Sequence, residues 1–399
     1  MISKNRAFIN LSELLAIFGR KGGGAEFERA FAERVGARYG LVFPYCRSAI
    51  TALLRAMEIR DKEVIVPAYT CVVVPNAVVF SSNTPVFADI SLDDFNMTPE
   101  AVRTALTKQT KALVATHFYG YPCAIDQIRE IAGNDVLLIE DASLGSPAYL
   151  PGRKGIRGDV ALFSFNVCKH LDTGSGGIAV TNSDEIYQRL KSVRDREFSR
   201  PSLALSCNRF LRFLVRYIVF NEPVYTVLHH ASSVEFVDDM RKSIDLESLH
   251  AMPDYYRTFS DFQGKIGLVQ LRKLDYIVER RTFIAGIYNK ELNGIKGIVK
   301  PPMVADATYS HYALRVKNRD AILFREKMAK AGIETGKTLD YAVFNLPFNL
   351  QYCRQSYDNA ACAVSEIANL PNYPSLMDKK AYYIAAQTVR IVKEAQYGK

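Results

Sequence analysis

The amino-acid sequence predicts an α/β fold with a mostly parallel sheet, because short β-rich runs alternate with amphipathic helical segments from about residue 41 to residue 180. The β-rich runs are residues 41–43, 64–66, 85–87, 112–116, 136–139, 161–163 and 177–181. The helical segments between them include residues 48–59, 99–106 and 124–132. Ligands of such sheets bind at the carboxyl ends of the strands, so the residues that follow these runs are the first candidates for a functional site.

A second observation is a long helical pattern over residues 259–292, in which Leu268, Leu271, Leu274 and Ile277 recur at helical spacing. The chain after it mixes a strand with helices, at residues 312–316, 319–331 and 379–392. We therefore expect two domains. A large α/β domain covers residues 1–250 and a smaller α/β domain covers residues 251–399.

Residues 197–252 interrupt the alternation, and we expect them to be an insert in the large domain. Arg209, Arg212 and Arg216 fall within a narrow arc of a helical wheel, apolar side chains fill the rest, and Pro223 ends or kinks the helix. A helix that is apolar nearly all round is usually buried, which favours a packing or dimer role. A lid over the site is one alternative, and a peripheral membrane contact through residues 205–231 is another.

Composition limits the classes of function. The chain has 399 residues and a formal net charge of +9, which suits anionic small molecules or an anionic membrane surface and does not indicate nucleic acid. Seven cysteines at irregular spacing indicate reduced thiols and a cytoplasmic protein, with a location peripheral to the inner membrane face as an alternative. We recognise no secretory signal, no metal-ligand spacing and no run of the about 18 apolar residues that a membrane-spanning helix needs.

The first candidate site element is the junction after the strand that ends at Phe43. The turn Tyr45-Cys46-Arg47-Ser48 precedes a helix, and such a turn presents free N–H groups beside the positive end of the helix dipole, which is an anion site. Ser48 is suited to cap this helix and to touch a phosphate. By itself the junction is weak evidence, since most strand–turn–helix junctions with a serine are only caps.

Two more elements follow in the chain. Asp141 comes at the end of an apolar run, and a buried carboxylate there needs a cationic or hydrogen-bonding partner such as a protonated pyridine nitrogen. A helix cap or an ion pair is the alternative. Lys169 lies between an apolar strand and the glycine-rich residues 174–177, where lost solvation would lower its pKa and make its amine a nucleophile. An ordinary surface lysine is the alternative.

The order of these three elements is the order that a pyridoxal-phosphate site needs. One end holds the phosphate, one carboxylate holds the ring nitrogen, and one lysine binds the aldehyde. His117 follows a strand and is a candidate substrate-binding residue, with a structural histidine as an equal alternative, and Tyr119 is a second candidate. We find no GxGxxG between a strand and a helix, so a dinucleotide site is not predicted.

Short segments from about residue 26 to residue 376 match one known family in order and spacing. They are residues 63–70, 85–90, 117–120, 139–142, 158–165, 174–177, 263–271, 332–334 and 370–376. Through them the chain resembles the DegT/DnrJ/EryC1/StrS family, the sugar aminotransferases of the fold-type I pyridoxal-phosphate class. The resemblance implies a fold-type I architecture with active sites at the interface of a homodimer.

The resemblance also implies roles for the matching positions. Lys169 would bind the cofactor aldehyde and then move the proton between the substrate carbon and the cofactor, and Asp141 would keep the pyridine nitrogen protonated. Glutamate is the usual amino donor in this family, and nucleotide-linked keto-sugars are the usual acceptors, for lipopolysaccharide, other surface polysaccharides and related glycans.

Further cofactor contacts follow from the same resemblance. Arg47 and Ser48 would lie at the phosphate turn, and Ser164 would donate its hydroxyl. Residues near Arg257 would reach the phosphate bound by the partner subunit. Cys71 occupies the place where the family often has an aromatic ring stacked on the cofactor.

Some positions depart from the family pattern. Besides Cys71, Leu144 replaces a glutamine that commonly bonds the cofactor hydroxyl, and Tyr255 replaces an asparagine two residues before the arginine. These departures leave open a catalytically idle pyridoxal-phosphate-binding protein with an interaction or regulatory role. A sugar dehydratase or a non-sugar aminotransferase is the other alternative. Since the dehydratase branch has histidine at the position of Lys169, the lysine favours transamination.

Overall fold

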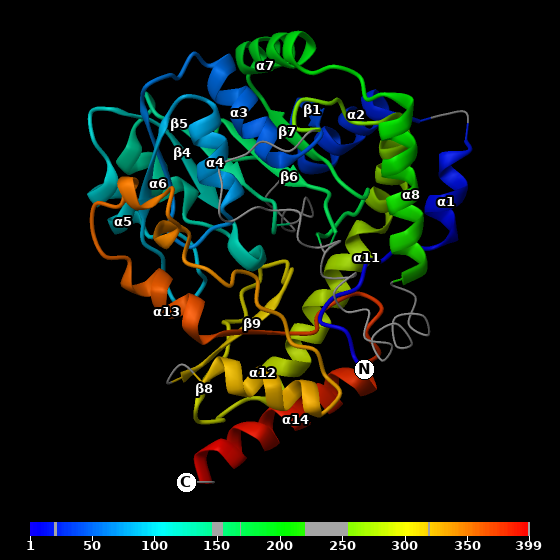
Figure 1. Cartoon of the computed structure of the whole chain (residues 1–399), viewed down its shortest axis with the longest axis vertical. Coiled ribbons are helices and arrows are strands. Elements are labelled where there is room, and N and C mark those ends of the chain that lie inside the picture. Colours follow the sequence, from blue (N-terminus) through cyan, green and yellow to red (C-terminus); the bar gives the residue numbers. More distant parts are fainter. Residues whose placement is uncertain (20–21, 146–154, 168, 220–253, 318–319, 398–399) are drawn as a thin grey trace.

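Two sheets organise the protein, whose computed structural model describes residues 1–19, 22–145, 155–167, 169–219, 254–317 and 320–397 (Figure 1). The larger sheet has seven strands in the order β1-β7-β6-β5-β4-β2-β3. These are β1 (Tyr39–Phe43), β2 (Glu63–Pro67), β3 (Thr84–Ala88), β4 (Thr110–Thr116), β5 (Leu137–Asp141), β6 (Val160–Ser164) and β7 (Gly177–Thr181). Every strand predicted between residues 41 and 181 is therefore present.

The larger sheet is mostly parallel, as predicted. Strand β2 pairs in parallel with β3 and β4, β4 with β5, and β5 with β6, whereas β7 is antiparallel to both β6 and β1. Parallel pairing brings the carboxyl ends of neighbouring strands to one edge of the sheet, where Thr116 of β4 lies opposite Asp141 of β5. The edge at which ligands bind in such sheets therefore carries the predicted carboxylate.

Helices cover both faces of the larger sheet. One face packs against α3 (Cys46–Ala56), α4 (Val73–Phe80) and α7 (Asp184–Glu197), and the other against α2 (Gly24–Val35), α5 (Pro99–Ala105) and α6 (Ile125–Ala132). Successive strand residues alternate between the faces, so Ile139 joins the core under α3 whereas Leu138 joins the core under α5 and α6. Burial on both faces explains the continuous apolar runs in the sequence.

Helix starts follow local capping chemistry. Thr98 Oγ1 accepts a hydrogen bond from the N–H of Ala101, and proline occupies the first position of α5. Ser260 and Gln263 form a capping box at the start of α11 (Asp261–Glu291), a helix of 31 residues. The long helix predicted between residues 259 and 292 is thereby confirmed.

The C-terminal part is smaller and also α/β. Its antiparallel sheet has the order β10-β9-β8. The elements of this part are β8 (Ile298–Val299), β9 (Tyr312–Val316), β10 (Ile367–Leu370), α12 (Ala321–Lys330), α13 (Asp358–Glu366), α14 (Asp378–Tyr397) and the short 3₁₀ helices η3 (Val343–Asn345) and η4 (Leu350–Tyr352). A third 3₁₀ helix, η1 (Phe118–Gly120), follows β4 of the larger sheet. The domain boundary predicted near residue 250 lies outside the described residues.

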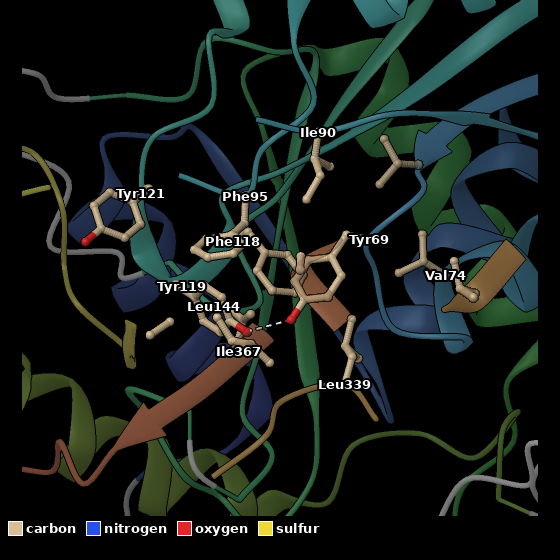
Figure 2. Packing of buried hydrophobic residues seen from close by; sticks show 14 of the residues in the cluster. Tyr69, Val74, Ile90, Phe95, Phe118, Tyr119, Tyr121, Leu144, Leu339 and Ile367 are labelled. Atoms are coloured by element: carbon tan, nitrogen blue, oxygen red, sulfur yellow. Dashed lines mark hydrogen bonds between the residues drawn. The ribbon is translucent and has the colours of Figure 1, made fainter. Parts of the chain in front are cut away.

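The two parts share one apolar core. Tyr69 and Phe118 from the larger sheet belong to the same buried cluster as Leu339 and Ile367 from the C-terminal part (Figure 2). The chain start also joins the C-terminal part, because Ile2 pairs with Ile333.

Two further helices flank α11, namely α1 (Leu11–Ile17) and α8 (Leu203–Val219). Helix α8 confirms the helix predicted in the insert, whereas residues 220–253 lie outside the described residues. Within the arc predicted for the three arginines, Arg209 and Arg216 make hydrogen bonds to the protein, whereas Arg212 is exposed.

Candidate active site

Helix α3 begins at the carboxyl end of β1, where an anion site was predicted. Its N-cap, Tyr45, makes no side-chain cap hydrogen bond, and the first-turn N–H groups of an α-helix have no acceptor within the helix. The helix starts at Cys46, so Ser48 lies in the first turn and is not the cap that the sequence predicted. The positive end of the helix nevertheless faces the edge of the sheet that carries the other candidates.

Glycine is required where β7 passes this turn. A Cβ atom on Gly177 would lie 2.5 Å from the backbone nitrogen of Cys46. A Cβ atom on Gly176, which has a φ of +132°, would lie 2.4 Å from the ring of Phe259. The glycine-rich turn that follows Lys169 in sequence therefore lets β7 approach the start of α3 closely, and Ser164 lies opposite Gly177 in the ladder.

Asp141 ends β5 and faces the α3 layer, because it shares the alternation of Ile139. The residue is only 4 % exposed. Its Oδ1 accepts a hydrogen bond of 2.9 Å from the N–H of Ser143, and within the described residues no hydrogen bond reaches Oδ2. One carboxylate oxygen therefore remains able to accept a donor that a ligand would bring.

Lys169 lies in a loop that returns on itself, since the N–H of Thr173 donates to the carbonyl of Phe165 at 3.0 Å. The residue is half-buried. Over the part of the chain that the structure describes, its Nζ makes no hydrogen bond and no ion pair. A half-buried amine without a protein partner is the state in which a lysine can react with a carbonyl group.

The electrostatics of Cys46 show that the predicted elements converge. Burial raises the pKa of the Cys46 thiol, the nearby Asp141 carboxylate adds to the rise, and Lys169 opposes it. The thiol also accepts a hydrogen bond of 3.1 Å from Ser143 Oγ. The start of α3, Asp141 and Lys169 are distant in sequence, and the structure brings all three to one place.

Two histidines to which the sequence analysis assigned no role border the site, namely His170 and His311. Burial, with a contribution from Arg281, lowers the pKa of both His170 and His311 to about 3, so both imidazoles are neutral at physiological pH. Lys169 contributes to the lowering at both rings, which places them near its amine. His311 directly precedes β9 in the C-terminal part, and no local pattern in the sequence distinguishes it.

Tyr255 explains one departure from the family pattern and corrects the role predicted for Ser48. Ser48 Oγ donates to the carbonyl of Tyr255 at 2.9 Å, so its hydroxyl proton is used within the protein. The Tyr255 hydroxyl donates to the carbonyl of Arg47 at 3.1 Å and shares a hydrogen bond of 2.7 Å with Thr51. Tyr255 therefore anchors the first turn of α3, and Ser48 can offer an anion its backbone N–H.

Three further cofactor contacts were predicted, at Arg47, Cys71 and Arg257. The Arg47 guanidinium lies over the ring of Tyr45, 4.3 Å from its centroid. Cys71 Sγ accepts a hydrogen bond of 3.7 Å from the hydroxyl of Tyr341, so a phenol from the C-terminal part lies against the position predicted for a stacking ring. Arg257 is exposed and donates to Ser199 Oγ, so within this chain it is not gathered with the other candidates.

His117 is held by the protein on both sides of its ring. Nδ1 accepts a hydrogen bond of 3.0 Å from the N–H of Cys123, so the ring proton of the neutral form lies on Nε2, which donates to Glu140 at 3.0 Å. The side chain is buried. Both nitrogens are thus occupied, which favours the structural role over the predicted substrate contact.

Tyr119 and Leu144 belong to the apolar core in Figure 2. The hydroxyls of Tyr119 and Tyr69 share a hydrogen bond of 2.9 Å, drawn as the dashed line. Burial raises the pKa of Tyr119 to about 12, and the residue is 0 % exposed. A substrate could reach Tyr119 only after movement of its neighbours, so the predicted contact is not supported by this arrangement.

The residues at the site fit pyridoxal phosphate. The first turn of α3 is suited to the phosphate, Asp141 Oδ2 to a protonated ring nitrogen, and the amine of Lys169 to the aldehyde. The fit rests on the Asp141 carboxylate oxygen and the Lys169 amine, for which the described residues provide no hydrogen-bond partner. No group of three or more His, Cys, Asp or Glu residues suited to a metal ion occurs among the described residues.

Comparison with known proteins identifies relatives along most of the chain. A model of the DegT/DnrJ/EryC1/StrS aminotransferase family matches residues 19–206 and 228–389. The spore coat polysaccharide biosynthesis protein SpsC of Bacillus subtilis is 28% identical over 383 residues, which cover 93% of this chain and 90% of SpsC. The GDP-perosamine synthase of Escherichia coli O157:H7 is 26% identical over 366 residues, which cover 90% of this chain and 87% of the synthase.

Solved structures share the fold. The aminotransferase TlmJ from Streptoalloteichus hindustanus superposes with a TM-score of 0.79 at 23% identity, covering 99% of this chain and 100% of TlmJ. Helicobacter pylori PseC, an aminotransferase involved in pseudoaminic acid biosynthesis, has a TM-score of 0.78 at 17% identity and covers 98% of this chain and 99% of PseC. The predicted fold-type I architecture is thereby confirmed.

Proposed function

The chain belongs to the DegT/DnrJ/EryC1/StrS aminotransferase family, and we propose from this that it transfers an amino group from glutamate to a nucleotide-linked keto-sugar with the help of pyridoxal phosphate. The observation that supports the proposal is that Ser143 bonds both Asp141 and Cys46 at the start of α3, while Lys169 is near enough to affect the pKa of the Cys46 thiol. Each of these groups has hydrogen-bonding capacity that the described residues leave unused.

The residues of the chain have separate roles in the proposed reaction. Lys169 binds the aldehyde carbon and afterwards moves a proton at the substrate carbon, since it is the only amine that we find in the described site. Asp141 holds a proton at the ring nitrogen. Bound pyridoxal phosphate supplies an electron sink for the carbon that gains or loses the amino group. His170 and His311 remain neutral, so they add no positive charge that would compete with the substrate amine.

The phosphate contacts are part of the proposal. The N–H groups of the first turn of α3 and the Ser164 hydroxyl bind the phosphate, and the Arg47 guanidinium adds positive charge. We propose a homodimer in which Arg257, exposed in this chain, reaches the phosphate held by the partner subunit. Cys71 borders the ring, together with Tyr341.

The acceptor and the setting are suggested by relatives. SpsC is described as a spore coat polysaccharide biosynthesis protein, and another relative is a GDP-perosamine synthase, so we propose a role in surface polysaccharide or related glycan synthesis. Lys169 supports transamination over sugar dehydration, because the dehydratase branch has histidine there. The departure at Tyr255, which supported an idle protein, has a structural explanation in the anchoring of α3.

Reduction with borohydride tests the central claim. The purified protein is soaked in pyridoxal phosphate, reduced and digested, and the modified peptide is mapped by mass spectrometry. We expect the label on Lys169, and Lys169→Ala is the matched control that should carry none. A label on another lysine, or no label on the wild type, would reject the site.

Absorbance and product analysis test the reaction. A yellow protein that bleaches with glutamate supports transamination, whereas a yellow protein that glutamate leaves unchanged supports an idle protein or another donor. Mass spectrometry of the products formed from a panel of nucleotide keto-sugars then identifies the acceptor. Loss of the keto oxygen and gain of nitrogen indicates amination, and loss of a hydroxyl without gain of nitrogen indicates dehydration.

A further inference from the structure

Helix α8 is attached to the protein by one face. Arg209 donates to the carbonyl of Thr258 at 2.9 Å and pairs with Asp254 at 3.2 Å. Phe213 is 1 % exposed, and Arg216 donates to the carbonyl of Gly174 in the glycine-rich turn after Lys169. This inner face therefore holds the helix firmly against the region of the proposed active site.

The outer face of α8 is apolar and exposed. Leu203, Leu211 and Ile218 are 81%, 58% and 55% exposed, and Cys207, one turn from both leucines, is exposed as well. Spacings of four and seven residues place these side chains along one stripe of the helix. Isolated exposed apolar residues are ordinary, but a continuous stripe along a helix marks an interaction surface.

Helix α1 repeats this arrangement. Leu11, Leu15 and Phe18 are 59%, 62% and 78% exposed and lie at positions i, i+4 and i+7. The opposite side of the helix carries Glu13, which is fully buried and pairs with Lys273 of α11 at 2.6 Å. The apolar stripe of α1 therefore points away from the protein.

The two stripes lie on the same flank of α11. Phe210 of α8 packs against Phe262, with ring centroids 6.0 Å apart, and Lys265 donates to the carbonyl of Gly19 just after α1 at 2.7 Å. Phe262 and Lys265 are three residues apart and so are neighbours on the surface of α11. In Figure 1 both helices lie to the right of α11.

Charge selects the partner of this surface. Arg212, at the edge of the inner face of α8, and Arg200 just before the helix are exposed, and neither α8 nor residues 198–202 contain an Asp or Glu. The one carboxylate of α1, Glu13, is buried and paired. A second copy that docked through the same face would bring like charges together, which is unfavourable, whereas an anionic surface is complementary.

We propose that the α1–α8 face, formed by Leu11, Leu15, Phe18, Leu203, Leu211 and Ile218, docks on the surface of an anionic lipid bilayer. The apolar side chains enter the boundary between headgroups and acyl chains, and the arginines contact the headgroups. No described helix is long and apolar enough to cross a membrane, so the contact is peripheral. The inner face of α8 then sets the proposed active site directly behind the membrane surface.

Vesicle flotation with the full chain tests the proposal. Vesicles of equal parts phosphatidylglycerol and phosphatidylcholine should bind the wild type, and vesicles of phosphatidylcholine alone should bind it much less. The triple variant Leu203→Ser, Leu211→Ser, Ile218→Ser should weaken partitioning by more than about tenfold. Arg212→Glu should weaken it by about fivefold or more, because it replaces an attracted charge by a repelled one.

A matched control uses exposed apolar residues elsewhere. Ile322, Leu323 and Leu350 are 62%, 47% and 57% exposed in the C-terminal part, and replacing all three by serine should leave vesicle binding unchanged. A second readout needs none of these substitutions. An environment-sensitive dye on Cys207 should shift to shorter emission wavelength with anionic vesicles, relative to a Cys207→Ser protein labelled in the same way.

Three results would overturn the proposal. Wild type that does not float with anionic vesicles and shows no dye shift would reject it. If the control variant with serine at three positions of the C-terminal part lost as much vesicle binding as the α8 variant, the α1–α8 face would not be the membrane-binding surface. A wild type that ignores vesicles, together with an α8 triple variant of lower mass in light scattering, would assign the face to contact between copies of the chain.

Discussion

Two polar clusters at the carboxyl edge of the same sheet differ in how completely they are satisfied. Glu140 and Asp141 are successive residues of β5 and face opposite sides of the sheet. The Glu140 carboxylate accepts hydrogen bonds from His117 Nε2 at 3.0 Å and from the N–H groups of Arg157 and Gly158 at 2.6 Å each. Among the described residues, the Asp141 carboxylate accepts only the bond from Ser143.

The comparison indicates which polar residues at this edge of the sheet are available to bind a ligand. In the Glu140 cluster each group serves another group of the protein, and His117 also accepts from Cys123. At the Asp141–Lys169 site, the described residues leave a carboxylate oxygen and an amine without a hydrogen bond or ion pair. Such groups can bind a ligand without first breaking a contact within the chain.

The largest expected effect concerns Lys169. Replacing it by alanine should lower kcat/KM by at least about 10³-fold, because the group that binds the aldehyde and moves the proton is removed. The free energy of unfolding should change by less than about 1 kcal/mol, since the amine has no protein partner to lose. Product formation and urea denaturation measure the two quantities. A fully active variant would remove Lys169 from the site.

The Glu140 cluster should show the opposite result, with a loss of stability and no loss of activity. Glu140→Gln should lower the free energy of unfolding by about 3 kcal/mol, because a buried charged hydrogen-bond network is broken, while kcat/KM per folded molecule is retained. Burial alone would raise the pKa of Glu140, but the hydrogen bonds from His117, Gly158 and Arg157 outweigh burial and lower it.

The pH dependence of Glu140→Gln provides the control. Since the folded-state pKa lies below that of the unfolded chain, the carboxylate stabilises the fold above a pH of about 4.3 and loses this contribution as the pH falls through the folded value. Urea midpoints measured from neutral to acid pH should therefore fall more steeply for the wild type than for the variant. Equal slopes would show that the network adds no stability.

Asp141→Asn should again lower activity and not stability, with a smaller effect on activity than loss of Lys169. We expect kcat/KM to fall by about 10²-fold, because the amide cannot keep a proton on the ring nitrogen as a carboxylate does. Stability of the cofactor-free protein should stay the same or rise slightly, since a buried charge with one hydrogen bond is removed. If Asp141→Asn lowered the free energy of unfolding as much as Glu140→Gln does, Asp141 would belong to a hydrogen-bond network that is complete within the protein.

The last prediction concerns stability alone and is a pH slope from His170. Its folded-state pKa is about 3, whereas an unfolded histidine titrates near 6.5, so the unfolded chain takes up a proton as the pH falls below about 6.5. His170 therefore lowers stability toward acid pH, by about 1.4 kcal/mol per pH unit between these values. His170→Asn should remove this share of the slope in urea denaturation. If the pH slope of the free energy of unfolding were unchanged in the variant, the pKa of His170 would not be lowered in the folded protein.

Much of the fold could be predicted from local patterns. The strands that end at Phe43, Asp141 and Ser164 follow from apolar runs, and the long helix α11 follows from its spacing and its capping residues. The start of α3 was predicted two residues late, because Ser48 looks like a cap in sequence. In the structure Tyr255, from a distant segment, uses the serine hydroxyl instead.

The sequence by itself determined the strands and helices and proposed Ser48, Asp141 and Lys169 as site residues, because strand and helix periodicity and turn chemistry are local properties of the chain. Tertiary structure alone decided which polar groups are satisfied. Both ring nitrogens of His117 bond to other residues, Cys123 and Glu140, and His311 comes to the site from the C-terminal part. Hydrogen-bond partners and burial come from segments far apart in sequence, so no local pattern reveals them.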